Sequence, residues 1–236
     1  MLDTETWLST AESVAHFARG LHARFRYHIH GIVHRLCAGG AEHYVMNVTS
    51  GASAHGRETI EDSTIVQPEL RSDGYCLVDA HGAVVAPSGA VASKSMLHYL
   101  QLFKQRPDTH VVMLWHGVAT DALATRRGEI PITLEHLNAN LFHIPVISTR
   151  RSPDDSWEVV RRWLAEQLSI PANTPDVLWG QPANAVVMTG YACLTVAETL
   201  GELGRRVRAI ERSAESVLLG AEAIPPQWLA LMHPRP

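Results

Sequence analysis

The sequence lacks any long hydrophobic run and has few cysteines. No stretch of its 236 residues approaches the roughly 20 consecutive apolar residues that a membrane-spanning helix needs. The N-terminus, MLDTETWLSTAESVAHF, is acidic where a signal peptide is basic. Cys37, Cys76 and Cys193 lie far apart and form no CxxC pair, which argues against a zinc knuckle or a redox dithiol. We therefore expect a soluble, cytoplasmic protein with reduced thiols and no membrane partner.

Positive charge is also scarce, and lysine above all. The formal net charge of −4 and the pI near 6.4 provide no broad electrostatic footprint for nucleic acid, so no nucleic-acid partner is expected. Only Lys94 and Lys104 are lysines among the 20 Lys and Arg residues. Histidine is abundant instead, with 14 copies against 5 Tyr and 4 Phe. That abundance raises the hypothesis of a metal site.

Hydrophobic periodicity predicts alternating helices and strands along the whole chain. Helices are expected at about 4–30, 93–105, 117–125, 133–140, from Pro153 onward and at 194–219, and strands at 43–49, 75–79, 83–86, 110–115, 141–147 and 185–189, the last strand. No linker or repeat separates them. The sequence therefore predicts a single α/β domain over 1–236, with a mixed central sheet between two helical layers. Its core is expected at about 15–220, between a short N-terminal lead and a Pro-rich C-terminal tail.

The order of several short motifs is similar to that of a known family. Arg106-Pro107-Asp108 follows a predicted helix, the next strand leads into ATDAL (119–123), and the segments LNANLFHIPV (137–146) and AVVMTG (185–190) come later. In this order they resemble the class II aldolase/adducin family, in register from about 15 to 220. The resemblance implies a three-layer α/β/α fold, a small-molecule substrate and a homo-oligomer, commonly a homotetramer with its pockets between subunits.

The same resemblance implies a catalytic divalent ion, usually zinc, held by three histidines beside a glutamate that acts as acid and base. The glutamate's position falls on Lys94, four residues before His98. The His-x-His pair falls on Leu114 and His116 if one residue is inserted, or on Met113 and Trp115 if none is, and the third histidine falls on Asn184. A catalytic zinc ordinarily has three protein ligands, so we expect no metal cofactor here, zinc and other divalent ions being disfavoured.

The replacements at those positions are polar, and they form the candidate catalytic set: Lys94, His116 and Asn184. Lys94 would supply the fixed positive charge of the lost ion, or form a Schiff base. His116 would act as general acid and base, and Asn184 would donate a hydrogen bond to a developing oxyanion. The resemblance places His43 and Asn47 in the family's phosphate-binding segment, and the residues expected to bind substrate are His43, Asn47, Ser88, Ser93 and His98.

Three functions remain open at this point. The first is a metal-independent lyase-type enzyme that acts on a small oxo or hydroxy acid through an enolate-like intermediate. The second is a non-catalytic, adducin-like assembly protein. Loss of the metal ligands is also what relaxed catalytic demand would leave. The third is a metal enzyme with relocated histidines, which needs a site that the sequence does not display. His28, His30 and His34 form an HxHxxxH spacing, which raises a metal hypothesis of its own. A turn expected at Gly31 argues against that spacing, and the polar replacements favour the enzyme over the assembly protein.

Overall fold

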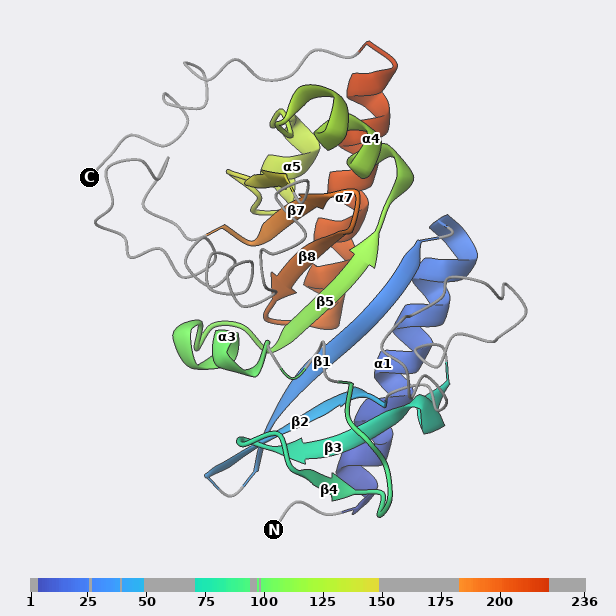
Figure 1. The fold of residues 1–236 in the computed structure, drawn as a ribbon, viewed down its shortest axis with the longest axis vertical. Coiled ribbons are helices and arrows are strands. Elements are labelled where there is room, and N and C mark those ends of the chain that lie inside the picture. The colour runs from blue at the N-terminus through green and yellow to red at the C-terminus, as the bar shows by residue number, and fades with distance from the viewer. Residues whose placement is uncertain are drawn as a thin grey trace.

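The computed structural model describes residues 4–25, 27–38, 40–48, 71–93, 97, 99–148 and 183–220. Within this part of the chain eight strands form one sheet in the order β4-β3-β2-β1-β5-β8-β7-β6 (Figure 1). Their bounds are β1 His28–Ala38, β2 Ala41–Asn47, β3 Tyr75–Asp79, β4 Val84–Ala86, β5 Val111–His116, β6 Val146–Ser148, β7 Ala185–Thr189 and β8 Ala192–Ala197. Among the described strands only β6 and β7 pair in parallel, so the predicted mixed sheet is confirmed.

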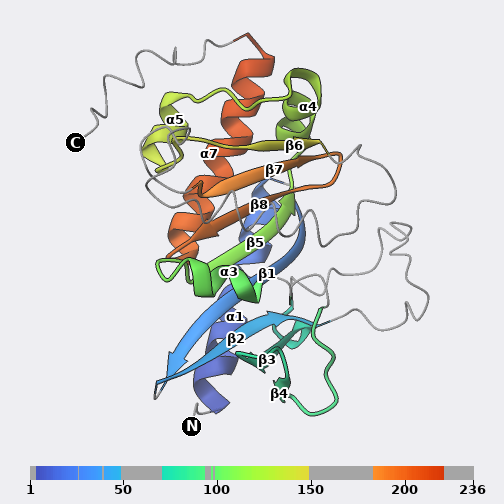
Figure 2. The same cartoon turned by 60° about the vertical axis from the view of Figure 1, so that its left-hand side comes forward.

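Helices cover both faces of this sheet, as the three-layer prediction requires. The described helices are α1 Thr4–Phe25, α3 Leu100–Gln105, α4 Val118–Arg127, α5 Leu134–Asn138 and α7 Leu200–Leu218, with a short 3-10 turn, η2, at Ser72–Gly74. Helices α1, α4 and α7 lie on one face of the sheet and α3 lies on the other (Figure 2). Their buried side chains belong to two separate core clusters accordingly. In the described part of the chain, no helix has the length and apolar character needed to span a bilayer.

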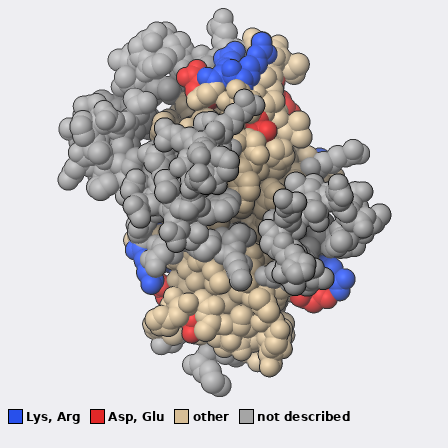
Figure 3. Space-filling view, viewed as in Figure 1, with Lys and Arg blue, Asp and Glu red and all other residues tan. Residues whose placement is uncertain are grey.

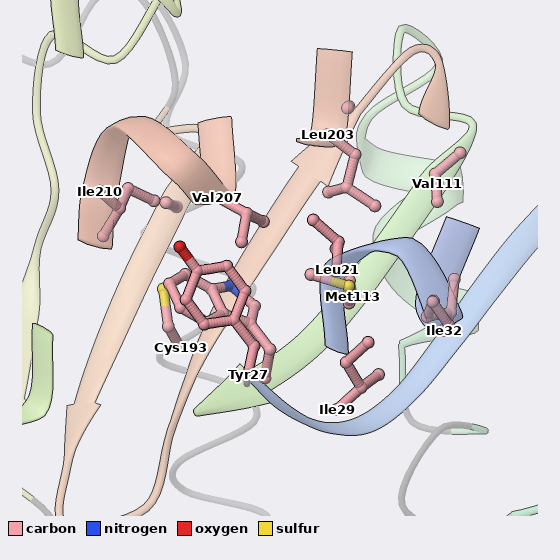
Figure 4. Packing of buried hydrophobic residues seen from close by; sticks show 14 of the residues in the cluster. Leu21, Tyr27, Ile29, Ile32, Val111, Met113, Cys193, Leu203, Val207 and Ile210 are labelled. Atoms are coloured by element: carbon pink, nitrogen blue, oxygen red, sulfur yellow. The ribbon is translucent and has the colours of Figure 1, made fainter. Parts of the chain in front are cut away.

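The larger core lies between the sheet and the pair α1 and α7. Figure 4 shows Tyr27, just before β1, and Met113 of β5 in this core. They pack with helix residues, namely Leu21 of α1 and Val207 and Ile210 of α7. The five side chains are buried, with at most 3% of their surface exposed. Burial of such side chains from two helices on one sheet face is the main force that fixes β1 and β5 at the centre.

The first helix is shorter than predicted, and the correction matters for the site. It ends at Phe25, and His28 and His30 belong to strand β1. Gly31, read from the sequence as a helix stop, instead lies where the register of β1 against β5 shifts between Ile29 and Gly31. A glycine inside a strand often marks such a bulge, so the residue was read correctly as a break and assigned to the wrong element.

The second correction concerns the end of the chain. The strand 185–189 is confirmed, but it is not the last, because Ala192–Ala197 forms β8 and the final helix begins only at Leu200. All six residues of β8 are buried. A strand covered on both faces shows no polar alternation, so its apolar residues resemble a helix start. Thr199 begins α7 by accepting a hydrogen bond from the Glu202 amide at 3.1 Å.

Of two other predicted helices, one can be compared with the structure in part and one cannot be compared. The helix expected at 93–105 is represented by α3, Leu100–Gln105, while 94–96 and 98 lie outside the described residues. The helix expected from Pro153 onward also lies outside them.

Candidate active site

His116 ends strand β5, beside the N-terminal end of β1. Its partner across the antiparallel pair is His28. The turn between β7 and β8 lies at the same end of the sheet, because Trp115 pairs with Cys193 just beyond it. The strands thus place two imidazoles opposite one another, and side chains at paired positions have Cβ atoms only about 5 Å apart.

A second pair of rings extends this arrangement. The His30 ring stands edge-on to His28, with centroids 4.6 Å apart, and lies parallel to Tyr191 of the β7–β8 turn, at 6.0 Å and 6°. We call His28, His30, His116 and Tyr191 the histidine cluster. His28 is exposed, and the other three members are half-buried.

The HxHxxxH spacing in the sequence indicated two members of this cluster, His28 and His30. Its third histidine, His34, does not belong to the cluster. His28 and His30 are two apart and share a face, as alternation in a strand requires. The bulge at Gly31 then shifts the alternation, because Ile29 and Ile32 both reach the α1 side of the sheet. His34 therefore follows Ile32 onto that side, and the sequence could not show that His116 takes its place.

The two histidines that β1 contributes to the histidine cluster, His28 and His30, are poor bases in this setting. Burial lowers the pKa of His30 to about 4, with further lowering from His28 and His116. Partial desolvation of its ring also lowers the pKa of His28, although part of the side chain is exposed, and His116 adds to the effect. Both rings are therefore neutral at neutral pH, and a neutral imidazole offers one N–H donor and one acceptor nitrogen. The buried Nε2 of His30 has no hydrogen-bond partner among the described residues.

The turn that carries Tyr191 is tied to α4. The carboxylate of Asp121, in the first turn of that helix, accepts a hydrogen bond from the Gly190 amide at 2.6 Å. Gly190 has a φ of 70°, a conformation that glycine adopts without strain. Asp121 thus links the helix that follows His116 to the turn that positions the Tyr191 ring.

Asn184 is not brought to this cluster. It precedes β7, and its Oδ1 accepts a hydrogen bond from Arg106 at 2.9 Å while its Nδ2 donates to the Asn140 carbonyl at 3.0 Å. Its own carbonyl pairs with Val196, opposite Val112, four positions back along β5 from His116. Counting six residues back from Gly190 reaches the far end of a strand that rises about 3.3 Å per residue. The structure therefore separates these two predicted catalytic residues.

The predicted substrate-binding residues divide in the same way. Asn47 is buried at the end of β2, where its Oδ1 accepts a hydrogen bond from the Ile32 amide at 2.6 Å and its backbone carbonyl accepts one from Ser93 at 2.9 Å. Asn47 thereby binds the backbone of β1 next to its bulge at Gly31. His43 lies toward the other end of β2, opposite Leu36, and Ser88 is exposed in the turn after β4.

Lys94 and His98 lie outside the described residues, so their placement relative to the cluster stays a prediction.

The described positions that the resemblance assigned to metal ligands do not fit a zinc site. Met113, Leu114 and Trp115 are buried in the two cores with at most 1% of their surface exposed, and only His116 offers an imidazole. In the described ranges, no group of three or more His, Cys, Asp and Glu side chains is arranged to hold a metal ion. Zinc needs about four donors, most of them from the protein, and these positions do not supply them.

Comparison with known proteins supports the fold. The family model described as Class II Aldolase and Adducin N-terminal domain matches residues 27–218. No curated protein matches the chain by sequence. Among solved structures, the putative aldolase/epimerase/decarboxylase YgbL from Escherichia coli is 17% identical, with a TM-score of 0.67 over 97% of this chain and 99% of its own.

Two further structures share the same architecture. An aldolase II superfamily protein from Pseudomonas syringae is 14% identical, with a TM-score of 0.64 over 100% of this chain and 87% of its own. The L-fuculose-1-phosphate aldolase from Thermus thermophilus is 18% identical, with a TM-score of 0.58 over 93% of this chain and 100% of its own. At such low identities these likenesses concern the fold.

Proposed function

Because the chain belongs to the Class II Aldolase and Adducin N-terminal domain family, we propose that it is an enzyme with a lyase-type activity on a small oxo or hydroxy acid. The reaction would pass through an enolate-like intermediate and proceed without the family's metal ion. The observation that carries this proposal is the pairing of His116 with His28 at one end of the sheet, beside Tyr191.

The names of the structural neighbours are consistent with an enolate. One is called an aldolase/epimerase/decarboxylase and another an L-fuculose-1-phosphate aldolase. Aldol cleavage, decarboxylation of a 3-oxo acid and epimerisation next to a carbonyl can each leave an electron pair on the carbon beside that carbonyl. Stabilising this pair is therefore a task that one pocket can serve for several reactions.

His116 would act as the acid and base of the cleavage. In the aldol direction of breakdown, its imidazole takes the proton of the substrate hydroxyl and that carbon becomes an aldehyde. The electron pair of the broken C–C bond moves into the neighbouring carbonyl as an enolate. The imidazolium then returns the same proton to the enolate carbon, so the step needs no further reactant.

Two other groups would meet the negative charge on the enolate oxygen. His28 is exposed and, with its lowered pKa, neutral at neutral pH, so it can donate a hydrogen bond without carrying charge. We assign the fixed positive charge to Lys94, whose position in the family resemblance belongs to the acidic residue. Asn184 has no role in this scheme, since Arg106 and the Asn140 carbonyl engage its side chain elsewhere.

The test follows exchange and cleavage at the carbon next to the carbonyl. Chelator-treated protein is incubated in D2O with a panel of small 2-oxo and hydroxy acids, and proton NMR records loss of the C–H signal and any cleavage products. We expect turnover by the unmodified protein and a loss of about 100-fold or more in His116→Gln. Lys94→Ala should also lose activity. His81→Gln, in the exposed turn after β3, is the matched control and should keep it.

Specific results would contradict the proposal. Stoichiometric zinc, iron or manganese in the purified protein, together with loss of turnover after chelation, would overturn metal independence. Absence of exchange and cleavage across the whole panel would favour the non-catalytic assembly function instead. Partial rescue by Lys94→Arg would support an electrostatic role for Lys94, whereas trapping of substrate on Lys94 by borohydride would assign a Schiff base.

A further inference from the structure

Glu211 is a buried carboxylate in the middle of α7, with only 5% of its surface exposed. Its Oε1 accepts a hydrogen bond from the Ala119 amide at 2.9 Å. Its Oε2 accepts one from the Thr120 amide at 3.0 Å and one from the Thr120 hydroxyl at 2.5 Å. A buried carboxylate is tolerated when hydrogen bonds replace the lost water, and three donors do so here.

These donors belong to the first turn of α4, which starts directly after β5. The N-cap of α4 is Gly117, which makes no side-chain capping bond. The first amides of a helix need acceptors from outside it, and a negative charge is favourable at that end. Glu211 therefore caps α4 from helix α7, at a position 91 to 92 residues after the amides that it binds.

The carboxylate also packs against the backbone next to His116. A Cβ atom added to Gly117 would lie 2.2 Å from Oε2 of Glu211 and 2.6 Å from Cζ3 of Trp115. Real side chains do not approach so closely, so only glycine fits between the carboxylate and the indole. The segment that leaves β5 is thus fixed by three hydrogen bonds on one side and by close packing at its first residue.

From this geometry we infer that Glu211 is a positioning residue for His116. It lies on the α7 side of the sheet, whereas His116 continues the alternation of Val112 and Leu114 toward the opposite side. Glu211 therefore acts through the Gly117–Thr120 turn. The catalytic meaning of this inference rests on the proposed function, but the structural link between Glu211 and the His116 ring is independent of it.

The decisive variant is Glu211→Gln, which keeps the shape of the side chain. One amide oxygen remains as an acceptor, but in either orientation of the side-chain amide its NH2 group faces a backbone N–H, that of Ala119 or that of Thr120, donor against donor. We expect kcat to fall about 10- to 100-fold with little change in KM, because the base is displaced while the rest of the pocket remains. Thr120→Val removes only the hydroxyl donor and should give a smaller loss of the same kind. Glu215→Gln, exposed one turn further along α7, is the control and should match the unmodified protein.

A second measurement needs no substrate. The nuclear Overhauser effect between the ring protons of His28 and His116, with the chemical shifts of the His116 ring, reports the position of the ring directly. We expect both to change in Glu211→Gln and Thr120→Val and not in Glu215→Gln. If Glu211→Gln does not fold, Thr120→Val decides the question alone.

The outcomes separate this inference from the proposed function. Unchanged His116 signals in a folded Glu211→Gln protein would overturn the positioning role, whether or not the protein is an enzyme. Changed signals with full retention of kcat would also overturn it for catalysis. Changed signals in a protein that turns over no substrate would support the structural link and leave the failure with the proposed function.

Discussion

His136 shows how burial controls an imidazole in this protein. It is fully buried in α5, where its Nδ1 accepts a hydrogen bond from the Thr133 amide at 3.0 Å, and Thr133 caps the helix in return. Burial lowers its pKa to about 4. The same cause lowers the pKa of His30 in the histidine cluster. Protonation of either ring therefore opposes the folded state.

The sign of the resulting pH dependence follows from proton binding. Unfolded His136 has a pKa of about 6.5, so between pH 6.5 and 4 the unfolded state binds more protons than the folded state. The free energy of unfolding should therefore be unaffected by this residue above pH 6.5 and fall as the pH drops toward 4. A shift of this size corresponds to about 3 kcal/mol.

His136→Gln tests this expectation without removing the cap. Glutamine at the third helical position can also accept from the N-cap amide, but it does not titrate. Urea unfolding followed by circular dichroism at several pH values should give a shallower fall in stability for this variant between pH 6.5 and 4. His81→Gln, which changes an exposed histidine, should keep the slope of the unmodified protein. An equal slope in His136→Gln would show that His136 does not contribute.

At the scale of elements, the turn between β7 and β8 depends on α4 for its position. Asp121→Ala removes the acceptor for the Gly190 amide and a favourable charge in the first turn of the helix. We expect a loss of about 1 to 3 kcal/mol in the free energy of unfolding, measured by urea titration. The His30 ring signals should also shift, since Tyr191 stacks on that ring.

The conservative and control variants define the cause. Asp121→Asn keeps an acceptor oxygen and should recover most of the stability, while Glu129→Ala, just beyond the end of α4, should change little. Equal losses in Asp121→Ala and Asp121→Asn would mean that the charge, and not the hydrogen bond to Gly190, carries the effect.

The strands of the sheet show what the sequence could and could not predict. The sequences of strands β3 and β7 are short apolar runs bounded by turn residues, and their predicted bounds are confirmed. Strands β1 and β8 were missed because Gly31 resembled a helix stop and because a strand buried on both faces resembles a helix. Both missed strands flank β5, and the histidine cluster therefore could not be assembled from the sequence, although His116 was chosen correctly as a strand-end residue.

At the scale of the whole molecule, the family resemblance predicted the fold and about the extent of the family match, 15–220 against the matched 27–218, but not the partners of each residue. The absence of ligand-type residues at positions 113–115 could be read from the sequence, and the structure adds that these side chains are buried. The separation of Asn184 from His116 depends on the direction and length of β7, and the hydrogen bonds from Ala119 and Thr120 to Glu211 join residues more than ninety positions apart. Long-range contacts of this kind have no local sequence signal.

The surface next to the site is the remaining feature that concerns the whole molecule. Val118 directly follows the His116–Gly117 turn and exposes 77% of its surface. On the face seen in Figure 3, described Lys and Arg side chains gather where α4 and α7 end, and few charges lie over β1 to β4. The family resemblance implies a pocket formed between subunits, and Val118 is the exposed apolar residue beside the histidine cluster at which this implication can be tested.

We therefore predict a homotetramer, with a mass in solution four times that of the 26.0 kDa chain, measured by light scattering after size-exclusion chromatography. Val118→Asp should lower this mass, because an interface buries a charge poorly, yet it should not unfold α4, since aspartate suits the first turn of a helix. Leu219→Asp, at an exposed position beyond the end of α7, should leave the mass unchanged. A monomeric mass for the unmodified protein would contradict the tetramer, and an unchanged mass for Val118→Asp would place the interface away from the histidine cluster. The pocket would then be built by one chain alone, and the Glu211 and His116 variants would act within a single subunit.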